Sequence, residues 1–185
     1  MRSRQRHLFE SINNLYFVTS TIVGFINVFN DDLYNIFVDD LSYYQKRGDF
    51  VILCYVLMPN HFHLIIKTST KCNVSSCVAN IKRISSRHIS SYLAKNNGGG
   101  LLQLLKNKAS EEPSPDSKIW KPRFDCMVII KEDILKQKIG YCHYNPVRAG
   151  LVKEPTDWPY SSSRNYTGFS EVPMAVDNSW KCLGF

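Results

Sequence analysis

The chain has 185 residues, of which 44% are hydrophobic and 21% charged, and its formal net charge is +7 at pH 7. This length and composition favour one globular domain over residues 1–185 and exclude a repeat array or a disordered chain. No apolar run reaches the roughly 18 residues that a membrane-spanning helix needs, so we expect a cytoplasmic protein without a membrane partner. The positive charge is compatible with a phosphate-bearing partner.

The first predicted elements are a strand, a helix and a hairpin. Residues 15–23 are rich in aromatic and β-branched side chains, which is typical of a strand. Apolar residues then recur at helical spacing over 33–46, and Gly48 provides a stop. Residues 51–67 read as two strands joined by a turn at Pro59-Asn60.

The second half of the chain adds two helices and a strand. A helix over 78–92 has a basic flank, and residues 96–118, with their glycines, acids and prolines, predict a mobile loop. Residues 127–130 read as a strand, and a helix over 132–145 is expected to stop at Pro146. This order indicates an α+β, ferredoxin-like sandwich with a central antiparallel sheet and helices packed on it, followed by a C-terminal extension from about residue 153.

The cysteines are predicted to be reduced and mostly structural. They form no Cys-x-x-Cys pair, and several lie inside apolar runs, where a free cysteine behaves as a small hydrophobic residue. They are Cys54, Cys72, Cys77, Cys126, Cys142 and Cys182.

His61 and His63 are the most informative pair, because they flank Phe62 at the start of an apolar strand. Side chains alternate along a strand, so both imidazoles share one face while Phe62 points into the other. Such a pair is half of a site for a divalent ion. By itself the pair is equally typical of a surface or core strand.

Tyr141 and Asn145 lie four residues apart on the last predicted helix and therefore on one face. Two imidazoles and one amide oxygen would suit Mg²⁺ or Mn²⁺ acting on a phosphodiester. A phenol, with an ordinary pKa of about 10, needs a nearby cation or base to become a nucleophile. Two alternatives remain open from the residues alone: Tyr144 as the functional tyrosine, and a zinc site that recruits Cys142 and His143.

These segments resemble the single-tyrosine transposases of the HUH nuclease class, whose motif is histidine, hydrophobic, histidine. The resemblance is carried by residues 58–65 with the histidine pair and by residues 141–152, which begin with Tyr141. Within that class, residues 119–125 and 157–162 look like the branch associated with repetitive extragenic palindromes (REP). The similarity covers most of the chain, from about Leu15 to Tyr166.

The resemblance implies a metal-dependent endonuclease and strand-transferase that acts on single-stranded or hairpin DNA. Tyr141 would become linked to the 5′ phosphate and release a 3′ hydroxyl, while His61, His63 and Asn145 would hold the metal. Two departures are that residues 96–118 do not match the family pattern and that Lys131 stands where the family commonly has arginine. Asn145 also precedes a proline, which disfavours helical backbone.

The basic residues expected to contact DNA are Lys82, Arg83, Arg87, Arg123, Lys131 and Arg148. Aromatic side chains that could stack on bases, or equally belong to the core, are Tyr16, Phe17, Trp120 and Phe124. The alternatives to a transposase are a protein that binds structured DNA without cutting it and a phosphodiesterase that uses water. A monomer and a homodimer are both compatible with the sequence.

Overall fold

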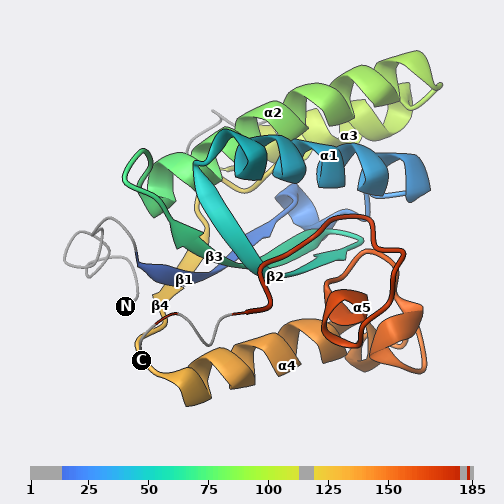
Figure 1. The fold of residues 1–185 in the computed structure, drawn as a ribbon. Helices are drawn as coiled ribbons and strands as arrows, with labels where there is room; N and C mark the ends of the chain where they lie inside the picture. The colour runs from blue at the N-terminus through green and yellow to red at the C-terminus, as the bar shows by residue number, and fades with distance from the viewer. Residues whose placement is uncertain (1–13, 113–118, 180–182, 184–185) are drawn as a thin grey trace.

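The computed structural model describes residues 14–112, 119–179 and 183 (Figure 1). The elements are, in chain order, β1 (Leu15–Thr21), η2 (Val23–Phe25), α1 (Asp31–Arg47), β2 (Phe50–Met58), β3 (His61–Thr68), α2 (Val74–Lys95), α3 (Gly99–Ser110), β4 (Asp125–Val128), α4 (Glu132–Arg148), η3 (Pro155–Asp157) and α5 (Ser163–Tyr166). No helix among the described residues is long and apolar enough to cross a membrane.

The four strands form one sheet in the order β2-β3-β1-β4, and every neighbouring pair is antiparallel. In this register Thr19 of β1 stands opposite His63 of β3, and Thr21 stands opposite His61. Asp125 of β4 faces Thr19 from the other side. The central strand β1 therefore lies between the histidine pair and the short edge strand β4.

Helices cover both faces of the sheet, as Figure 1 shows: α1, α2 and α3 lie on one side, and α4 lies on the other with α5. Phe62, Leu64 and Ile66 belong to the core beneath α1 and α2, whereas Ile65 belongs to the core beneath α4. This alternation places His61 and His63 on the α4 side. The prediction of an α+β sandwich with an antiparallel sheet is confirmed.

The prediction of a loop over residues 96–118 is wrong for much of that segment, because Gly99–Ser110 forms helix α3. Leu105 and Ala109 are four residues apart and buried, and the helix packs against α2 and η2. The glycines suggested a loop, but they occupy the first turn, where a weak helix former costs little and later packing compensates. Residues 113–118 lie outside the described residues, and the mobility of the segment stays a prediction.

Helix α4 does not stop at Pro146, as the sequence had suggested, but continues to Arg148. A proline inside a helix removes one N–H and leaves the carbonyl four residues earlier without its usual donor. The next turn is nevertheless closed, since the amide of Ala149 donates to the carbonyl of Asn145 at 3.0 Å and that of Leu151 donates to Pro146 at 3.0 Å. Asn145 is consequently helical, and the expected bias away from helix is not realised there.

The segment after α4 runs along the outer edge of β2. The amide of Leu57 donates to the carbonyl of Tyr160, and the amide of Ser162 donates to that of Tyr55, each at 2.9 Å. Further along, the amide of Asp177 donates to the carbonyl of Ile52 at 2.9 Å. The C-terminal extension therefore satisfies backbone groups that an edge strand would otherwise expose.

The cysteines that the structure describes are all free thiols, and those in the core are Cys54, Cys72, Cys77 and Cys142. Cys126 is partly exposed on β4. This agrees with the expectation of reduced, structural cysteines. Cys182 lies outside the described residues.

Candidate active site

The histidine pair is presented by the tight turn between β2 and β3. His61 and His63 project from the same face of β3, and their ring centroids are 4.9 Å apart. Phe62 points the opposite way and is fully buried under α1 and α2. The predicted geometry of the pair is therefore confirmed.

Hydrogen bonds orient His61 so that one particular nitrogen remains available. Nδ2 of Asn60 donates to the carbonyl of Phe25 at 3.0 Å, so the Asn60 atom that lies 2.7 Å from Nδ1 of His61 is the amide oxygen. That oxygen can only accept, and Nδ1 of His61 must carry the proton. Because burial lowers the pKa of His61 and favours the neutral ring, its Nε2 retains a lone pair.

His63 is held in a similar way from the neighbouring strand. Its Nδ1 lies 2.6 Å from Oγ1 of Thr19, a hydroxyl that can accept the Nδ1 proton. Burial, followed by the charges of His61 and Lys138, lowers the pKa of His63 to about 3, so the ring is neutral at physiological pH. Its Nε2 is buried and makes no hydrogen bond with the described residues. A buried nitrogen of this kind is unfavourable unless a ligand completes it.

Tyr141 approaches the pair from α4. Its ring centroid lies 5.1 Å from that of His63 and 5.9 Å from that of Phe17 on β1. The ammonium nitrogen of Lys138 lies 5.6 Å from the Tyr141 centroid, and the guanidinium carbon of Arg148 lies 5.4 Å from it. The structure therefore brings the tyrosine, one imidazole and two cations together at one end of the sheet.

Asn145 is partly buried one turn after Tyr141 on α4. Its role as a metal ligand stays a prediction, since the described contacts include none between its side chain and either histidine. The residues present fit a divalent ion in one respect, because the two imidazoles have their Nδ1 atoms engaged and the Nε2 of His63 unpartnered. In the described part of the chain, no group of three or more His, Cys, Asp or Glu side chains is placed to hold a metal.

The alternative zinc site is excluded by the position of Cys142 and His143. Both lie on the buried face of α4, where Nε2 of His143 is 2.9 Å from Oγ of Ser162 and 3.4 Å from Sγ of Cys54. These side chains belong to the packing between α4, β2 and the C-terminal segment. Tyr144, the rival tyrosine, is 52% exposed on α4, and no ring contact with the histidines is among its described contacts.

The predicted DNA-binding residues divide into exposed and buried positions. Lys82 is buried, with its ammonium donating to the carbonyls of Lys121 at 2.6 Å and Pro122 at 2.9 Å. The prediction that Lys82 contacts DNA from an exposed flank is therefore wrong. The remaining five are exposed and keep that role as an expectation: Arg83, Arg87, Arg123, Lys131 and Arg148.

The aromatic residues that could stack on bases also divide into buried and partly exposed positions. Tyr16 and Trp120 are buried in the core beneath α1 and α2 and are not available to stack on bases. Phe17 packs on His63 with ring centroids 5.3 Å apart, and it belongs to the candidate site. Phe124 is partly exposed ahead of β4.

Three residues of the site were missed in the sequence: Thr19, Asn60 and Lys138. Lys138 lies three residues before Tyr141, and helical spacing alone could have placed it beside the phenol. Asn60 adjoins His61 and could have been considered as its partner. Thr19 could not have been found without the strand register, because it meets His63 only through the pairing of β1 with β3.

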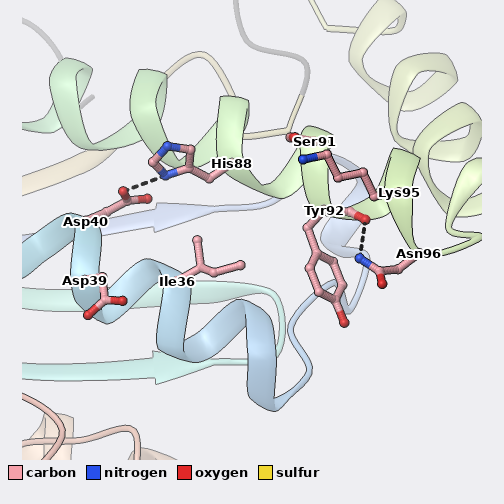
Figure 2. A pocket seen from close by; sticks show the side chains of 8 residues that line it. All are labelled: Ile36, Asp39, Asp40, His88, Ser91, Tyr92, Lys95 and Asn96. Atoms are coloured by element: carbon pink, nitrogen blue, oxygen red, sulfur yellow. Dashed lines mark hydrogen bonds and ion pairs between the residues drawn. The ribbon is translucent and has the colours of Figure 1, made fainter.

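A separate pocket of about 420 Å³ lies between α1 and α2, on the other side of the sheet from the histidine pair. Figure 2 shows Asp40 of α1 bonded to Nδ1 of His88 on α2, at 2.8 Å, beside Ile36, Tyr92 and Lys95. None of the predicted site residues lines this pocket.

Comparison with known proteins finds transposases both by sequence and by fold. A family model described as "Transposase IS200 like" matches residues 26–100. A Haemophilus influenzae protein with the provisional name REP-associated tyrosine transposase is 26% identical over 149 residues, covering 80% of this chain and 78% of the relative. A solved structure of a REP-associated tyrosine transposase bound to a REP hairpin has 20% identity and a TM-score of 0.65, covering 92% of this chain and 90% of that one, and therefore shares the fold. The resemblance seen in the sequence is confirmed: the chain is similar to the IS200-like transposases over residues 26–100, and to REP-associated tyrosine transposases in sequence and in fold.

Proposed function

We propose that this protein cleaves and rejoins single-stranded DNA next to a hairpin, with Tyr141 as the nucleophile and a divalent metal at the histidine pair. The observation that carries the proposal is the placement of the Tyr141 ring 5.1 Å from His63, whose buried Nε2 has no partner among the described residues. Hairpin DNA as the substrate is supported by the bound REP hairpin of the structural relative.

In the proposed reaction the phenolic oxygen of Tyr141 attacks the phosphorus of a phosphodiester. A bond forms between that oxygen and phosphorus, the bond to the 3′ oxygen breaks, and the phenolic proton passes to solvent while the leaving oxygen gains a proton. The products are a 5′-phosphotyrosine and a free 3′ hydroxyl. The reverse attack by a 3′ hydroxyl restores the phosphodiester, so strands can be rejoined without an external energy source.

The chain's own residues would assist at three points. Lys138 and Arg148 place positive charge beside the phenol and the phosphate on which negative charge develops. His61 and His63 would hold a Mg²⁺ or Mn²⁺ ion, which when bound supplies Lewis-acid polarisation of the phosphate. Thr19 and Asn60 fix the two imidazole rings through Nδ1.

The test is formation of a covalent adduct with a hairpin oligonucleotide that carries single-stranded flanks, in the presence of Mn²⁺. Denaturing gel electrophoresis should show a protein–DNA band that disappears with Tyr141→Phe and with a chelator. Tyr144→Phe is the matched control, because Tyr144 lies on the same helix but is 52% exposed, and that variant should form the adduct at the parental rate.

Other outcomes would overturn the proposal. An adduct that persists in Tyr141→Phe refutes this nucleophile. DNA binding with no cleavage under any divalent metal would identify a binding protein instead. Cleavage without an adduct, in both the parent and Tyr141→Phe, would identify a phosphodiesterase that uses water.

A further inference from the structure

Helix α4 covers little of the β1–β4 half of the sheet face that carries the histidines. It packs on β2 and β3 and meets β1 at Phe17, whereas farther along β1 Thr19 and Thr21 are only partly buried, and Asp125 of β4 is exposed. Because Thr19 and Thr21 stand opposite His63 and His61, the uncovered half begins next to the histidine pair. A strand that reaches the candidate active site can therefore lie across β1 and β4.

A cleft of about 690 Å³ lies on this uncovered half, a volume within the range of pockets that hold small organic ligands. Thr19 and Thr21 of β1 are shared between the cleft and the surroundings of the histidine pair. Among the described residues, the lining consists of Thr19, Thr21, Phe25, Glu112, Lys121, Pro122, Arg123, Phe124 and Asp125. It combines aromatic rings with two cations, the composition that binds single-stranded nucleic acid.

Phe25 is held in the cleft at an energetic cost. Its ring is 63% exposed, and its backbone has φ of 56°, in the left-handed region that favours glycine. The carbonyl of Phe25 accepts a hydrogen bond from Asn60, the same side chain that orients His61. Strained backbone and an exposed aromatic ring both oppose stability, and such features concentrate at binding sites. Asn60 therefore connects the strained backbone of Phe25 to the orientation of His61.

The Lys121–Pro122 segment of the cleft is held in place by the buried ammonium of Lys82. Lys82 donates to the carbonyls of Lys121 and Pro122, and the amide of Lys121 donates to the carbonyl of Thr21 at 2.8 Å. These hydrogen bonds fix the backbone of Lys121 and Pro122 against α2 and β1. The ammonium nitrogen of Lys121 then lies 3.5 Å from the centroid of the Phe25 ring, so a cation and an aromatic surface occur at one place.

We propose that this cleft is a subsite for one unpaired nucleotide of the DNA strand that enters the active site. The base stacks on Phe25, and the backbone phosphate lies near Lys121 and Arg123. Asp125 and Glu112 can accept hydrogen bonds from base amino groups but cannot bind phosphate, which assigns the cations and the carboxylates to different parts of the nucleotide. The proposal rests on the proposed function, because it takes single-stranded DNA as the ligand.

The test compares a short single-stranded oligodeoxyadenylate with an abasic strand of equal length, in a Tyr141→Phe background in which no adduct can form. The parent should bind the strand with bases more tightly, and Phe25→Gly should reduce this preference by about 10-fold, the size of one base–aromatic stack. Glycine is the replacement of choice, because it removes the ring while relieving the positive φ, so the variant should fold.

Phe169→Ala is the matched control. Phe169 is also exposed, at 51%, and the guanidinium carbon of Arg164 lies 5.6 Å from its ring centroid, but it does not line the cleft. This variant should keep the full preference for bases. Circular dichroism and thermal melting should show that both variants are folded.

The base-preference experiment tests the nucleotide subsite independently of the cleavage reaction. An unchanged base preference in folded Phe25→Gly overturns the subsite, whether or not Tyr141 forms an adduct. An equal loss in Phe169→Ala also overturns it, because the effect would then not belong to the cleft. A selective loss in Phe25→Gly supports the subsite even if the adduct experiment with Tyr141 fails.

Discussion

At the scale of single residues, the site depends on which atoms are already engaged. Asn60 and Thr19 occupy the Nδ1 atoms of His61 and His63, and the Nε2 of His63 is left buried without a partner among the described residues. A tautomer fixed in advance lowers the cost of binding an ion, because no ring has to rotate or exchange a proton. The contacts of single side chains also explain why the neighbouring residues Lys82 and Arg83 have different roles.

Mutation of Lys82 should affect the stability of the protein much more than mutation of Arg83. Lys82→Met should lower the free energy of unfolding by about 3 kcal/mol, because the carbonyls of Lys121 and Pro122 lose a charged donor in a buried place. Arg83 is exposed, so Arg83→Met should change stability by less than about 0.5 kcal/mol. Urea denaturation of the two variants measures both quantities.

For DNA affinity, we expect Arg83 to matter more than Lys82. If Arg83 contacts a phosphate, Arg83→Met weakens binding at low salt and reduces the slope of log affinity against log salt by about 1. A variant with the parental slope would show that Arg83 lies on a solvated flank. Equal stabilities of Lys82→Met and Arg83→Met would contradict the structural role of Lys82.

At the scale of elements, α1 and α2 are joined through a buried carboxylate. Asp40 of α1 is 5% exposed and bonds Nδ1 of His88 on α2, while its Oδ2 makes no hydrogen bond with the described residues (Figure 2). Burial raises the pKa of Asp40 to about 6, although His88 acts in the opposite direction. The contact between these two helices should therefore depend on pH.

The stability that Asp40 contributes should fall as the pH rises. The folded protein holds the Asp40 proton up to a pKa of about 6, whereas the unfolded chain releases it near 3.8, so the contribution is complete below pH 4 and is lost between pH 4 and 6. Relative to the parent, Asp40→Asn should gain up to about 3 kcal/mol over that interval, since one pKa unit corresponds to about 1.4 kcal/mol. Denaturation curves at several pH values give this difference.

Asp39→Asn provides the control for this pH dependence. Asp39 neighbours Asp40 on α1 but is exposed, and its charge only adds to the rise in the Asp40 pKa that burial causes first, so its replacement should leave most of the pH dependence in place. If the parent and Asp40→Asn show the same pH dependence, the Asp40 carboxyl is not held in an unfavourable environment.

The sequence predicted the elements well where their signal is local. Periodicity located the helices and strands to within a few residues, and alternation placed His61 and His63 on one face. The errors lie where the decisive contact is distant in sequence. Lys82 was taken for a surface residue because its acceptors, Lys121 and Pro122, come together with it only in the fold. Helix α3 was missed because its burial against η2 outweighs its glycine-rich beginning.

At the scale of the whole molecule, Ser162 joins three parts of the structure. It is fully buried, its hydroxyl accepts from the amide of Tyr55 on β2 at 3.0 Å, and it lies 2.9 Å from Nε2 of His143 on α4. The C-terminal segment therefore connects the sheet edge to the helix that carries Tyr141. The position of Tyr141 should therefore depend on this junction.

Ser162→Ala should destabilise the protein by about 2–4 kcal/mol, because the buried amide of Tyr55 loses its acceptor and Nε2 of His143 keeps only the more distant thiol of Cys54. Ser161→Ala is the matched control, since Ser161 is equally buried but its hydrogen bonds are longer, at 3.3 Å, and its loss should cost about 1 kcal/mol or less. Thermal and urea unfolding measure the difference. Equal costs for the two serines would contradict the central role of Ser162.

The C-terminal segment on β2 also restricts how the sheet could be extended. A further strand, from this chain or another copy, can hydrogen-bond only to an edge that is not already paired. The Ile52, Tyr55 and Leu57 side of β2 is occupied, and in the described part of the chain the remaining edge is that of β4. Asp125 of β4 lines the cleft proposed to hold a nucleotide. Sheet extension and entry of a DNA strand would therefore compete for the same edge of the molecule.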